Sequence, residues 1–522
     1  MEAQINKTVT SLEQSNANEF LKVANHFKLG NLPTESPNIK TMHLSHEAKH
    51  NIAQAILTIK NVDSDVFKIL DDKLGELSFL HQRIKTTIDS GGNIFLCGCG
   101  ATGRLSLALE AIWRVHHKNN PVLKERVISF MAGGDVALIH SVEKFEDFPE
   151  FGERQLRELG FKQGDLLIST TEGGETPFVI GATEAASLIS TNEPFFLYCN
   201  PDDILILSAE RSKKVISNPK IHKINLTVGP MALTGSTRMQ ATTILMYGVG
   251  LAMWYFDQSF DAARIELAKF TNIFNSTDFS FLKPFIERES DIYQQGEYLL
   301  YETDSALGIS ILTDTTERSP TFSLYPFENQ LDQNKIPSLS YLFINETNNN
   351  EEAWNNLLGR PPRAFHWKEV TSQTSRERLM GFNISAEFPR LRENYHHIIH
   401  HNFKITFNQH ANKLTFELDE IKHDFILEDM NFLSTHLLLK ILLNNLSTVI
   451  MGRMGRYEDN LMTWVRASNN KLIDRAVRYA DKLLQKKGIT ISYDELVKKC
   501  FELKDVTPRD QALVLKIVEA FS

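Results

Sequence analysis

The sequence predicts an α/β protein made of two parallel-sheet units, with a helical N-terminal arm and a small helical C-terminal tail. Between residues 93 and 200, short apolar runs alternate with helix-like stretches, as in buried parallel strands joined by crossover helices. The same alternation of apolar runs and helical stretches recurs, less clearly, between residues 298 and 451. Such a recurrence indicates a degenerate internal repeat.

Polarity and amphipathic patterning divide the 522 residues into four regions. The chain starts as a polar arm, and amphipathic patterning from residue 46 to about residue 88 then predicts helices. The expected regions are an arm at residues 1–50, a first α/β unit at 51–280, a second at 281–481 and a helical C-terminal region at 482–522.

The first unit contains four apolar runs that predict buried strands. They are NIFLC (93–97), RVISFMAGG (126–134), DLLISTT (165–171) and EPFFLYCN (193–200). Helical stretches separate the runs, and a helix-rich segment from residue 234 to about 274 closes the unit. Ligands of parallel sheets collect at the carboxyl ends of the strands, so we expect a site where turns follow Cys97, Met131 and Thr171.

The second unit repeats this pattern without the glycine-rich turns. Its expected strands and helices lie in YLLYETDSALGISILTD (298–314), SLSYLFIN (338–345), RLMGFNIS (378–385), KITFNQH (404–410) and LSTHLLLKILLNNLSTVIM (433–451). The last of these is a long apolar helix.

Composition narrows the class of protein. A net charge of −9 argues against a general nucleic-acid or anionic-membrane partner, because phosphate-rich surfaces demand a basic face. The first residues lack the basic and apolar blocks of a signal peptide, and we expect no run long enough to span a bilayer. Four cysteines cannot form a disulfide framework. We therefore expect a cytoplasmic protein.

The stretch CGCGATGR (97–104) allows three interpretations. Cys97 and Cys99 as metal ligands lack the further ligands that a zinc site needs. The glycine spacing fits a dinucleotide fingerprint, but no carboxylate follows at the distance where it would bind a ribose. The third interpretation is a turn that holds a phosphate at a helix N-terminus. We therefore expect neither a metal nor a cofactor.

A histidine run, His396-His397-Ile398-Ile399-His400-His401, contains pairs four residues apart. Such pairs chelate a metal if they lie on one helix. No catalytic carboxylate pattern is close by, which favours a solvated or partner-facing helix.

The loop STTEGGETP (169–177) follows a predicted strand and precedes a helix with Pro177 near its start. Hydroxyls, glycines and free backbone N–H groups at a helix N-terminus suit a phosphate. Glu172 and Glu175 would repel that phosphate unless they turn outward or bind a sugar hydroxyl. A plain helix cap is the alternative.

Taken together, the two loops resemble those of a sugar isomerase (SIS) domain, a phosphosugar-binding fold with a flavodoxin-like sheet. Eight motifs follow one another along the chain: LPTESPNIKT (32–41), CGCGATGR (97–104), AGGDVALIHSVEKFED (132–147), TPFVIG (176–181), CNP (199–201), LTGSTRM (233–239), LNNLSTVIMGRMGRYEDNLM (443–462) and ASNNKLIDRA (467–476). In this order they resemble the motifs of the N-acetylmuramic acid 6-phosphate etherases and the glucokinase regulatory protein.

The resemblance implies a phosphosugar site between the two units. The phosphate would meet Ala101, Thr102, Thr171, Glu172, Gly173, Thr176 and Ser236. The sugar would meet Glu143 and Glu146 of EKFED, and further contacts would come from Glu317, Lys471 and Arg475. The layout with two SIS units resembles the regulatory protein and implies a sugar kinase as its partner. The chain would act as a monomer with an internal pseudo-dimer, or as a homodimer.

The resemblance also indicates which carboxyl groups an active etherase would need, and these distinguish an enzyme from a sensor. The etherases remove lactate with two carboxyl groups, a base and an acid. Glu146 stands where the base is expected. The acid position falls on Ile112 or Trp113, which carry no carboxylate, and Glu110 would face away from the site on a helix. A phosphosugar-binding sensor is therefore favoured, with an etherase or a related lyase or isomerase as the alternative.

Overall fold

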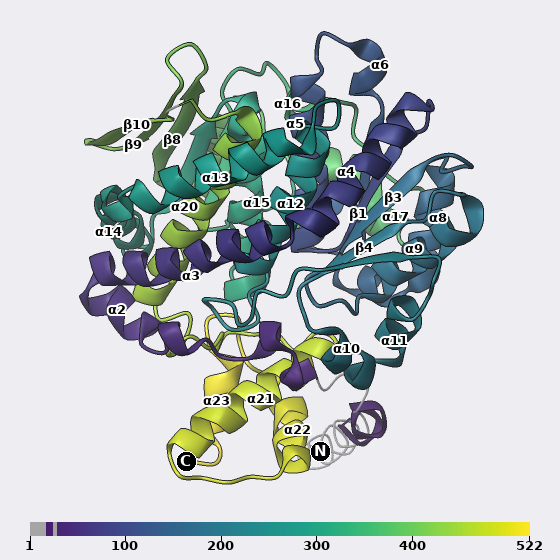
Figure 1. Ribbon diagram of the computed structural model, residues 1–522. Coiled ribbons are helices and arrows are strands. Elements are labelled where there is room, and N and C mark those ends of the chain that lie inside the picture. Colours follow the sequence, from purple (N-terminus) through teal and green to yellow (C-terminus); the bar gives the residue numbers. More distant parts are fainter. Residues whose placement is uncertain (1–16, 25–28, 428) are drawn as a thin grey trace.

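A computed structural model describes residues 17–24, 29–427 and 429–522, and it contains two five-stranded sheets (Figure 1). The strands β1, β3 and β4 lie with α8, α9 and α11 on the right of Figure 1, and β8, β9 and β10 lie at the upper left. Helices α21, α22 and α23 form a separate layer below both. The predicted fold class, two tandem α/β units with helical ends, is confirmed.

The first sheet is fully parallel, with strand order β2-β1-β3-β4-β5. Its strands are β1 (Ile94–Gly98), β2 (Val127–Met131), β3 (Leu166–Thr170), β4 (Phe195–Tyr198) and β5 (His222–Asn225). The three central strands are buried throughout, which explains their continuous apolar runs. This is the flavodoxin-like order, and it places the ends of β1 and β3 side by side at its switch point.

Helices cover both faces of this sheet and continue into the centre of the molecule. They are α3 (Ile52–Asp72), α4 (Leu74–Asp89), α5 (Ala101–His116), α6 (Pro121–Lys124), α7 (Val136–Ile139), α8 (Pro149–Glu158), α9 (Pro177–Ile189), α10 (Asp202–Ser208), α11 (Glu210–Ile216), α12 (Gln240–Trp254) and α13 (Phe260–Ser276).

The second sheet is only partly parallel. Strands β6 (Tyr298–Thr303), β7 (Ser340–Ile344) and β8 (His400–Asn408) run parallel, whereas β9 (Lys413–Leu418) and β10 (Ile421–Ile426) continue as an antiparallel meander. The reason is the length of the connections. Four residues join β8 to β9 and two join β9 to β10, and such short loops can only build hairpins.

Helices of the second half and of the C-terminal region complete the fold. They are α14 (Leu282–Gln294), α15 (Ser305–Phe322), α16 (Asn350–Leu358), α17 (Thr371–Thr374), α18 (Arg376–Met380), α19 (Phe388–His396), α20 (Phe432–Arg453), α21 (Asn470–Lys486), α22 (Tyr493–Leu503) and α23 (Leu513–Glu519).

Helix α20 is the central helix of the molecule. It packs against α2 (Leu44–His50), α3, α12, α14 and α15, so elements of both units surround it. The expectation that no run is long enough to span a bilayer is wrong for this helix, which passes that test by length and composition. Its apolar window is entirely buried inside the protein, as in a core helix.

The histidine run does not form one helix. Helix α19 ends at His396, His397 takes a left-handed backbone (φ 53°), and β8 begins at His400. The expected solvated helix is therefore wrong, and pairs four residues apart do not share a helical face. Among the described residues, no group of three or more His, Cys, Asp or Glu side chains could hold a metal ion.

A buried charge cluster joins the two units. Glu110 of α5 accepts from Arg360 Nε (3.1 Å) and Arg363 Nη2 (2.9 Å), which belong to the segment after α16. Within α5, Arg114 Nε also donates a hydrogen bond to Glu110. Arg360 Nη1 donates a further hydrogen bond to Asp135, at 2.6 Å. Burial raises the pKa of Glu110, but the three arginines outweigh burial and hold that pKa well below its ordinary value. The carboxylate stays charged at neutral pH, so its contribution to stability is lost as the pH falls.

Replacing Glu110 with glutamine leaves buried arginines without their counter-charge. We expect Glu110→Gln to lower the free energy of unfolding by about 3 kcal/mol or more, because breaking a buried pair leaves an uncompensated charge. Denaturant titration at pH 7 measures this loss. The control is Glu153→Gln, which removes a half-exposed pair with Arg157 and should change stability by about 0.5 kcal/mol or less. Equal effects of the two variants would contradict the role of the cluster.

Candidate functional site

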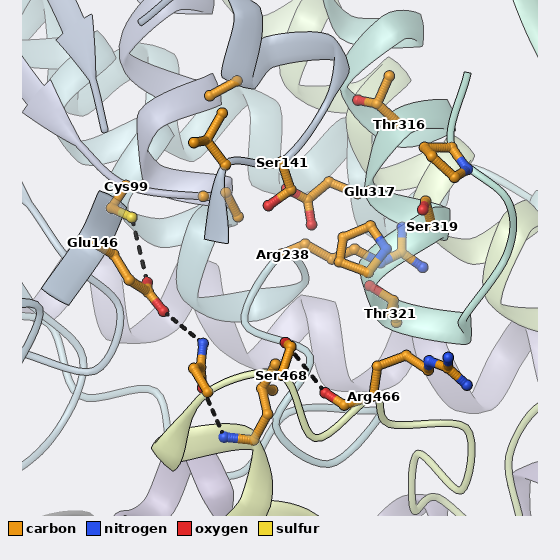
Figure 2. A pocket seen from close by; sticks show the side chains of 18 of the residues that line it. Cys99, Ser141, Glu146, Arg238, Thr316, Glu317, Ser319, Thr321, Arg466 and Ser468 are labelled. Carbon is orange, nitrogen blue, oxygen red and sulfur yellow. Dashed lines mark hydrogen bonds between the residues drawn. The ribbon is translucent and has the colours of Figure 1, made fainter. Parts of the chain in front are cut away.

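A cavity of about 740 Å³ lies where the two units meet (Figure 2). The first unit contributes the turn after β1, the segment after α7 and the residues before α12. The second unit contributes the end of α15, the segment before α21 and the first turns of α21, and the C-terminal region contributes Arg509. In Figure 2, Cys99 and Glu146 lie on one side of the cavity, and Ser319, Thr321 and Arg466 lie on the other.

The turn after β1 presents the N-terminus of α5 to the cavity. Gly100 has φ 55°, and a Cβ on Gly98 would lie 2.3 Å from backbone atoms of Thr102, so both positions require glycine. Ala101, one of the residues expected to meet the phosphate, lines the cavity. Thr102 is fully buried, and its hydroxyl donates to the Cys99 carbonyl (2.9 Å), so it braces the turn without lining the cavity. The open helix N-terminus suits an anion.

Glu146 points into the cavity from the short helix η5 (Glu143–Asp147). Its carboxylate accepts from Cys99 Sγ at 3.4 Å and from Asn469 Nδ2 at 3.3 Å. Burial raises the pKa of Glu146 even though Lys471 opposes this. The side chain of Glu143 lies outside the described part of the structure. Glu146 therefore lies in the cavity wall and has a raised pKa, and both properties suit a carboxyl group that exchanges protons or binds hydroxyls.

A segment of the second unit holds η5 in place. Phe145 stacks against Phe365 and Trp367, with ring centroids 5.8 and 5.6 Å apart, and both aromatic rings are buried in the core of the first unit. These two residues follow directly on the arginines that pair with Glu110. The charge cluster and the position of Glu146 are therefore connected through one short segment.

The predicted phosphate loop lies one layer behind the cavity wall. Thr171 and Thr176 hydrogen-bond each other through their hydroxyls at 3.2 Å, and neither lines the cavity, nor does Gly173. Glu175 turns toward Lys471 Nζ (2.9 Å) and Arg211. Burial raises the pKa of Glu175, but these cations outweigh burial and bring it to about 2. The loop therefore contacts Lys471 through Glu175, while Thr171, Gly173 and Thr176 stay outside the cavity wall.

Glu172 lies in the same layer and is also absent from the cavity wall. It accepts from the Thr242 hydroxyl at 3.3 Å. Burial raises its pKa to about 7, which backbone hydrogen bonding and Lys471 only partly offset.

Lys471 and Arg475 line the cavity from the first turns of α21. Asn469 caps this helix, its side-chain oxygen accepting from Leu472 N at 2.9 Å. Arg475 donates twice to Glu35, at 3.1 and 2.6 Å, so the N-terminal arm fixes α21.

Ser236 and Glu317 close the cavity from opposite units. Ser236 has a buried hydroxyl without a hydrogen-bond partner among the described residues, and it lines the cavity. Glu317 of α15 accepts from Arg104 Nη1 at 2.5 Å, which ties α15 to α5. Arg238 lines the cavity between them and donates to Asp314 at 2.8 Å.

The position expected for the second carboxyl group is occupied by core residues. Ile112 and Trp113 are buried in the main hydrophobic core, and neither lines the cavity. Glu110 binds Arg114, Arg360 and Arg363 in the charge cluster and does not line the cavity. Among the described residues, Glu146 and Glu317 are the carboxylates that line the cavity.

Several lining residues were not predicted from the sequence. Among them are His140, Arg238, Arg466 and Arg509. Arg238 lies inside the LTGSTRM motif, which could have indicated it. Nothing in the sequence near Arg509 signals a site.

Residues 77–187 match the family model described as the glucokinase regulatory protein N-terminal SIS domain. Over 233 residues the chain is 30% identical to an N-acetylmuramic acid 6-phosphate etherase from Staphylococcus epidermidis, covering 42% of this chain and 73% of the etherase. The chain belongs to the N-acetylmuramic acid 6-phosphate etherase family. This SIS-domain family is the one that the ordered motifs predict.

Two further comparisons show how much of other relatives this chain covers. The etherase of Photobacterium profundum is 29% identical over 215 residues, and the match spans 41% of this chain and 65% of that enzyme. A tagatose-6-phosphate ketose/aldose isomerase from Escherichia coli aligns over 82% of this chain and 97% of its own, at 11% identity and a TM-score of 0.41. This last likeness is distant, and membership in the etherase family rests on the sequence relatives.

The raised pKa of Glu172 predicts a pH-dependent stability. A carboxyl group whose pKa rises from 4.5 to about 7 on folding stabilises the protein fully below pH 4.5 and loses that contribution as the pH rises through 7. We expect Glu172→Gln to reduce the fall in unfolding free energy between pH 5 and pH 8 by up to about 3 kcal/mol, since one pKa unit is about 1.4 kcal/mol.

Denaturant titrations at both pH values measure this difference. Glu150→Gln, at an exposed position of α8, serves as the control and should leave the pH dependence unchanged. A Glu172→Gln profile that overlays the wild-type profile would refute the assignment.

Proposed function

We propose that this chain is a phosphosugar-binding protein that senses its ligand through the relative position of its two SIS units. The observation that carries the proposal is the cavity itself, whose wall comes from both units and from the C-terminal region. A ligand in it would contact the N-terminus of α5 in one unit and Glu317 in the other. Ligands bias a conformational equilibrium when they contact one arrangement better than another.

The charge of the cavity wall supports an anionic ligand. Among the described residues, six cationic side chains line the wall against two carboxylates. The cations are Arg104, Arg238, Arg466, Lys471, Arg475 and Arg509. Cations and a helix N-terminus suit a phosphate, and cavity carboxylates such as Glu146 suit the hydroxyls of a sugar.

The missing carboxyl group favours binding without turnover. Elimination of a lactyl ether requires one group to take a proton and another to protonate the leaving oxygen. Glu146 is suited to the first task. Ile112 and Trp113 carry no carboxylate and are buried in the core, and the second carboxylate among the described cavity residues, Glu317, is paired with Arg104 of α5. A sugar kinase is the partner that we propose for such a sensor.

Ligand binding should raise the melting temperature of the protein. We expect at least one hexose or amino-sugar phosphate to do so in a thermal-shift screen, because a ligand that binds only the folded state stabilises it. Lys471→Met should reduce the shift by removing a cavity cation. Lys487→Met, at an exposed position just after α21, is the matched control and should keep it. No shift with any phosphosugar would overturn the proposal.

A lactate assay separates the sensor from a lyase, the alternative that Glu146 favours through its position and raised pKa. Incubation with N-acetylmuramic acid 6-phosphate should release no lactate above the uncatalysed rate. Lactate release that disappears in Glu146→Gln would replace the sensor with an active etherase. Glu153→Gln serves as the control for this variant.

A further inference from the structure

One edge of the second sheet is open. The strand order places β10 at the end of this sheet, and among the described residues no strand other than β9 pairs with it. In Figure 1, β9 and β10 lie at the upper left margin of the molecule. An open edge strand offers a row of unpaired N–H and C=O groups to another strand.

The other edges of the two sheets are covered or short. Along β2, the Ser129 N–H donates to Glu110, and the Ser129 carbonyl accepts from Arg363. Along β7, the Ile344 N–H donates to the Ile384 carbonyl at 2.8 Å. Strand β5 has only four residues. Among the described strands, the six-residue β10 is therefore the longest edge without such a cover.

Alternate residues of β10 direct their backbone groups away from β9. A two-residue turn joins the strands and pairs Leu418 with Ile421, and the Leu427 N–H donates to the carbonyl of Asn412, just before β9. Antiparallel partners alternate between pairs that exchange hydrogen bonds and pairs that do not, so the odd-numbered residues of β10 bond to β9. The residues whose backbone groups point outward are Lys422, Asp424 and Ile426.

The charges on this edge fit a second copy of the same strand. Lys422 and Asp424 project from one face of the sheet, two residues apart, and both are exposed. When two copies of β10 pair antiparallel about a two-fold axis at His423, Lys422 of each copy lies directly opposite Asp424 of the other. An axis at Lys422 or at Asp424 would instead place like charges opposite each other, which destabilises a strand pair. Charge therefore selects one register.

The opposite face of β10 carries apolar surface that such a pairing would cover. The His423 ring stacks on Phe281 with centroids 4.1 Å apart, and Ile421 and Phe281 are only partly buried. Burial lowers the pKa of His423, although Asp424 opposes this, so two facing imidazoles are neutral at pH 7 and do not repel each other. In the register centred on His423, Ile421 of each copy faces Phe425 of the other.

We propose that β10 is a homodimer interface, at which two copies of this chain join their second sheets edge to edge in one continuous antiparallel pairing. The two-fold axis passes through His423, and the same surface of each copy contributes twice, as in most dimers of identical chains. None of the β10 residues lines the cavity between the units, so the interface is independent of the proposed function.

Sedimentation velocity and light scattering of the full chain test the interface. We expect the wild-type mass to rise to twice that of a single chain as the concentration increases to about 0.1 mM, a range that also detects a weak dimer.

Charge-reversal variants assign the dimer to this register. Lys422→Glu places like charges opposite Asp424 of the second copy, and Asp424→Lys does so opposite Lys422. Each variant should weaken dimerisation at least about ten-fold, because two attractive pairs become repulsive. A mixture of the two variants should form a heterodimer, since every charge then meets its opposite. Lys213→Glu, at an exposed position of α11, is the matched control and should keep the wild-type affinity.

Three results would overturn the interface. The first is a wild-type chain that stays monomeric over the whole range, and the second is a dimer whose affinity neither single variant changes. The third is a mixture of the two variants that stays monomeric although circular dichroism shows both to be folded.

Discussion

Arginine–carboxylate contacts between the two units constrain the rest of this structure. Glu110 and Asp135 of the first unit are bound by Arg360 and Arg363 of the second, and Arg104 binds Glu317 across the same boundary. Charges buried this deeply are costly unless they are paired, so any change in the relative position of the two halves must keep or re-form these pairs. The segment that carries the arginines continues into the aromatic rings that hold Phe145, and through it Glu146.

The site depends on parts of the chain that are far apart in sequence. Glu35 of the N-terminal arm fixes Arg475, and Lys471 on the same helix reaches Glu175 behind the first-unit wall. No single unit contains the whole wall of the cavity. The affinity for a ligand bound there would therefore depend on the positions of both units and of the C-terminal region. A sensor requires this coupling between ligand binding and conformation.

The sequence predicts the order and type of the strands well where burial is complete, because continuous apolar runs between helices have few other structures open to them. The prediction from sequence fails where contacts between distant segments determine the local structure. The antiparallel meander after β8 follows from short connections, and the histidine run breaks at a left-handed residue that no pattern marks. At the site, Ala101, Glu146 and Ser236 follow from motifs, whereas Arg509 and His140 come to the cavity only through the packing of distant segments.

The central claim is that the cavity holds an intact phosphosugar between the two units. A crystal structure of the chain grown with N-acetylmuramic acid 6-phosphate tests it most directly. The account predicts an unbroken ligand in the cavity, with its phosphate at the N-terminus of α5 near Ser236. Density for a sugar phosphate that has lost its lactyl group, or a ligand bound outside this cavity, would contradict the account.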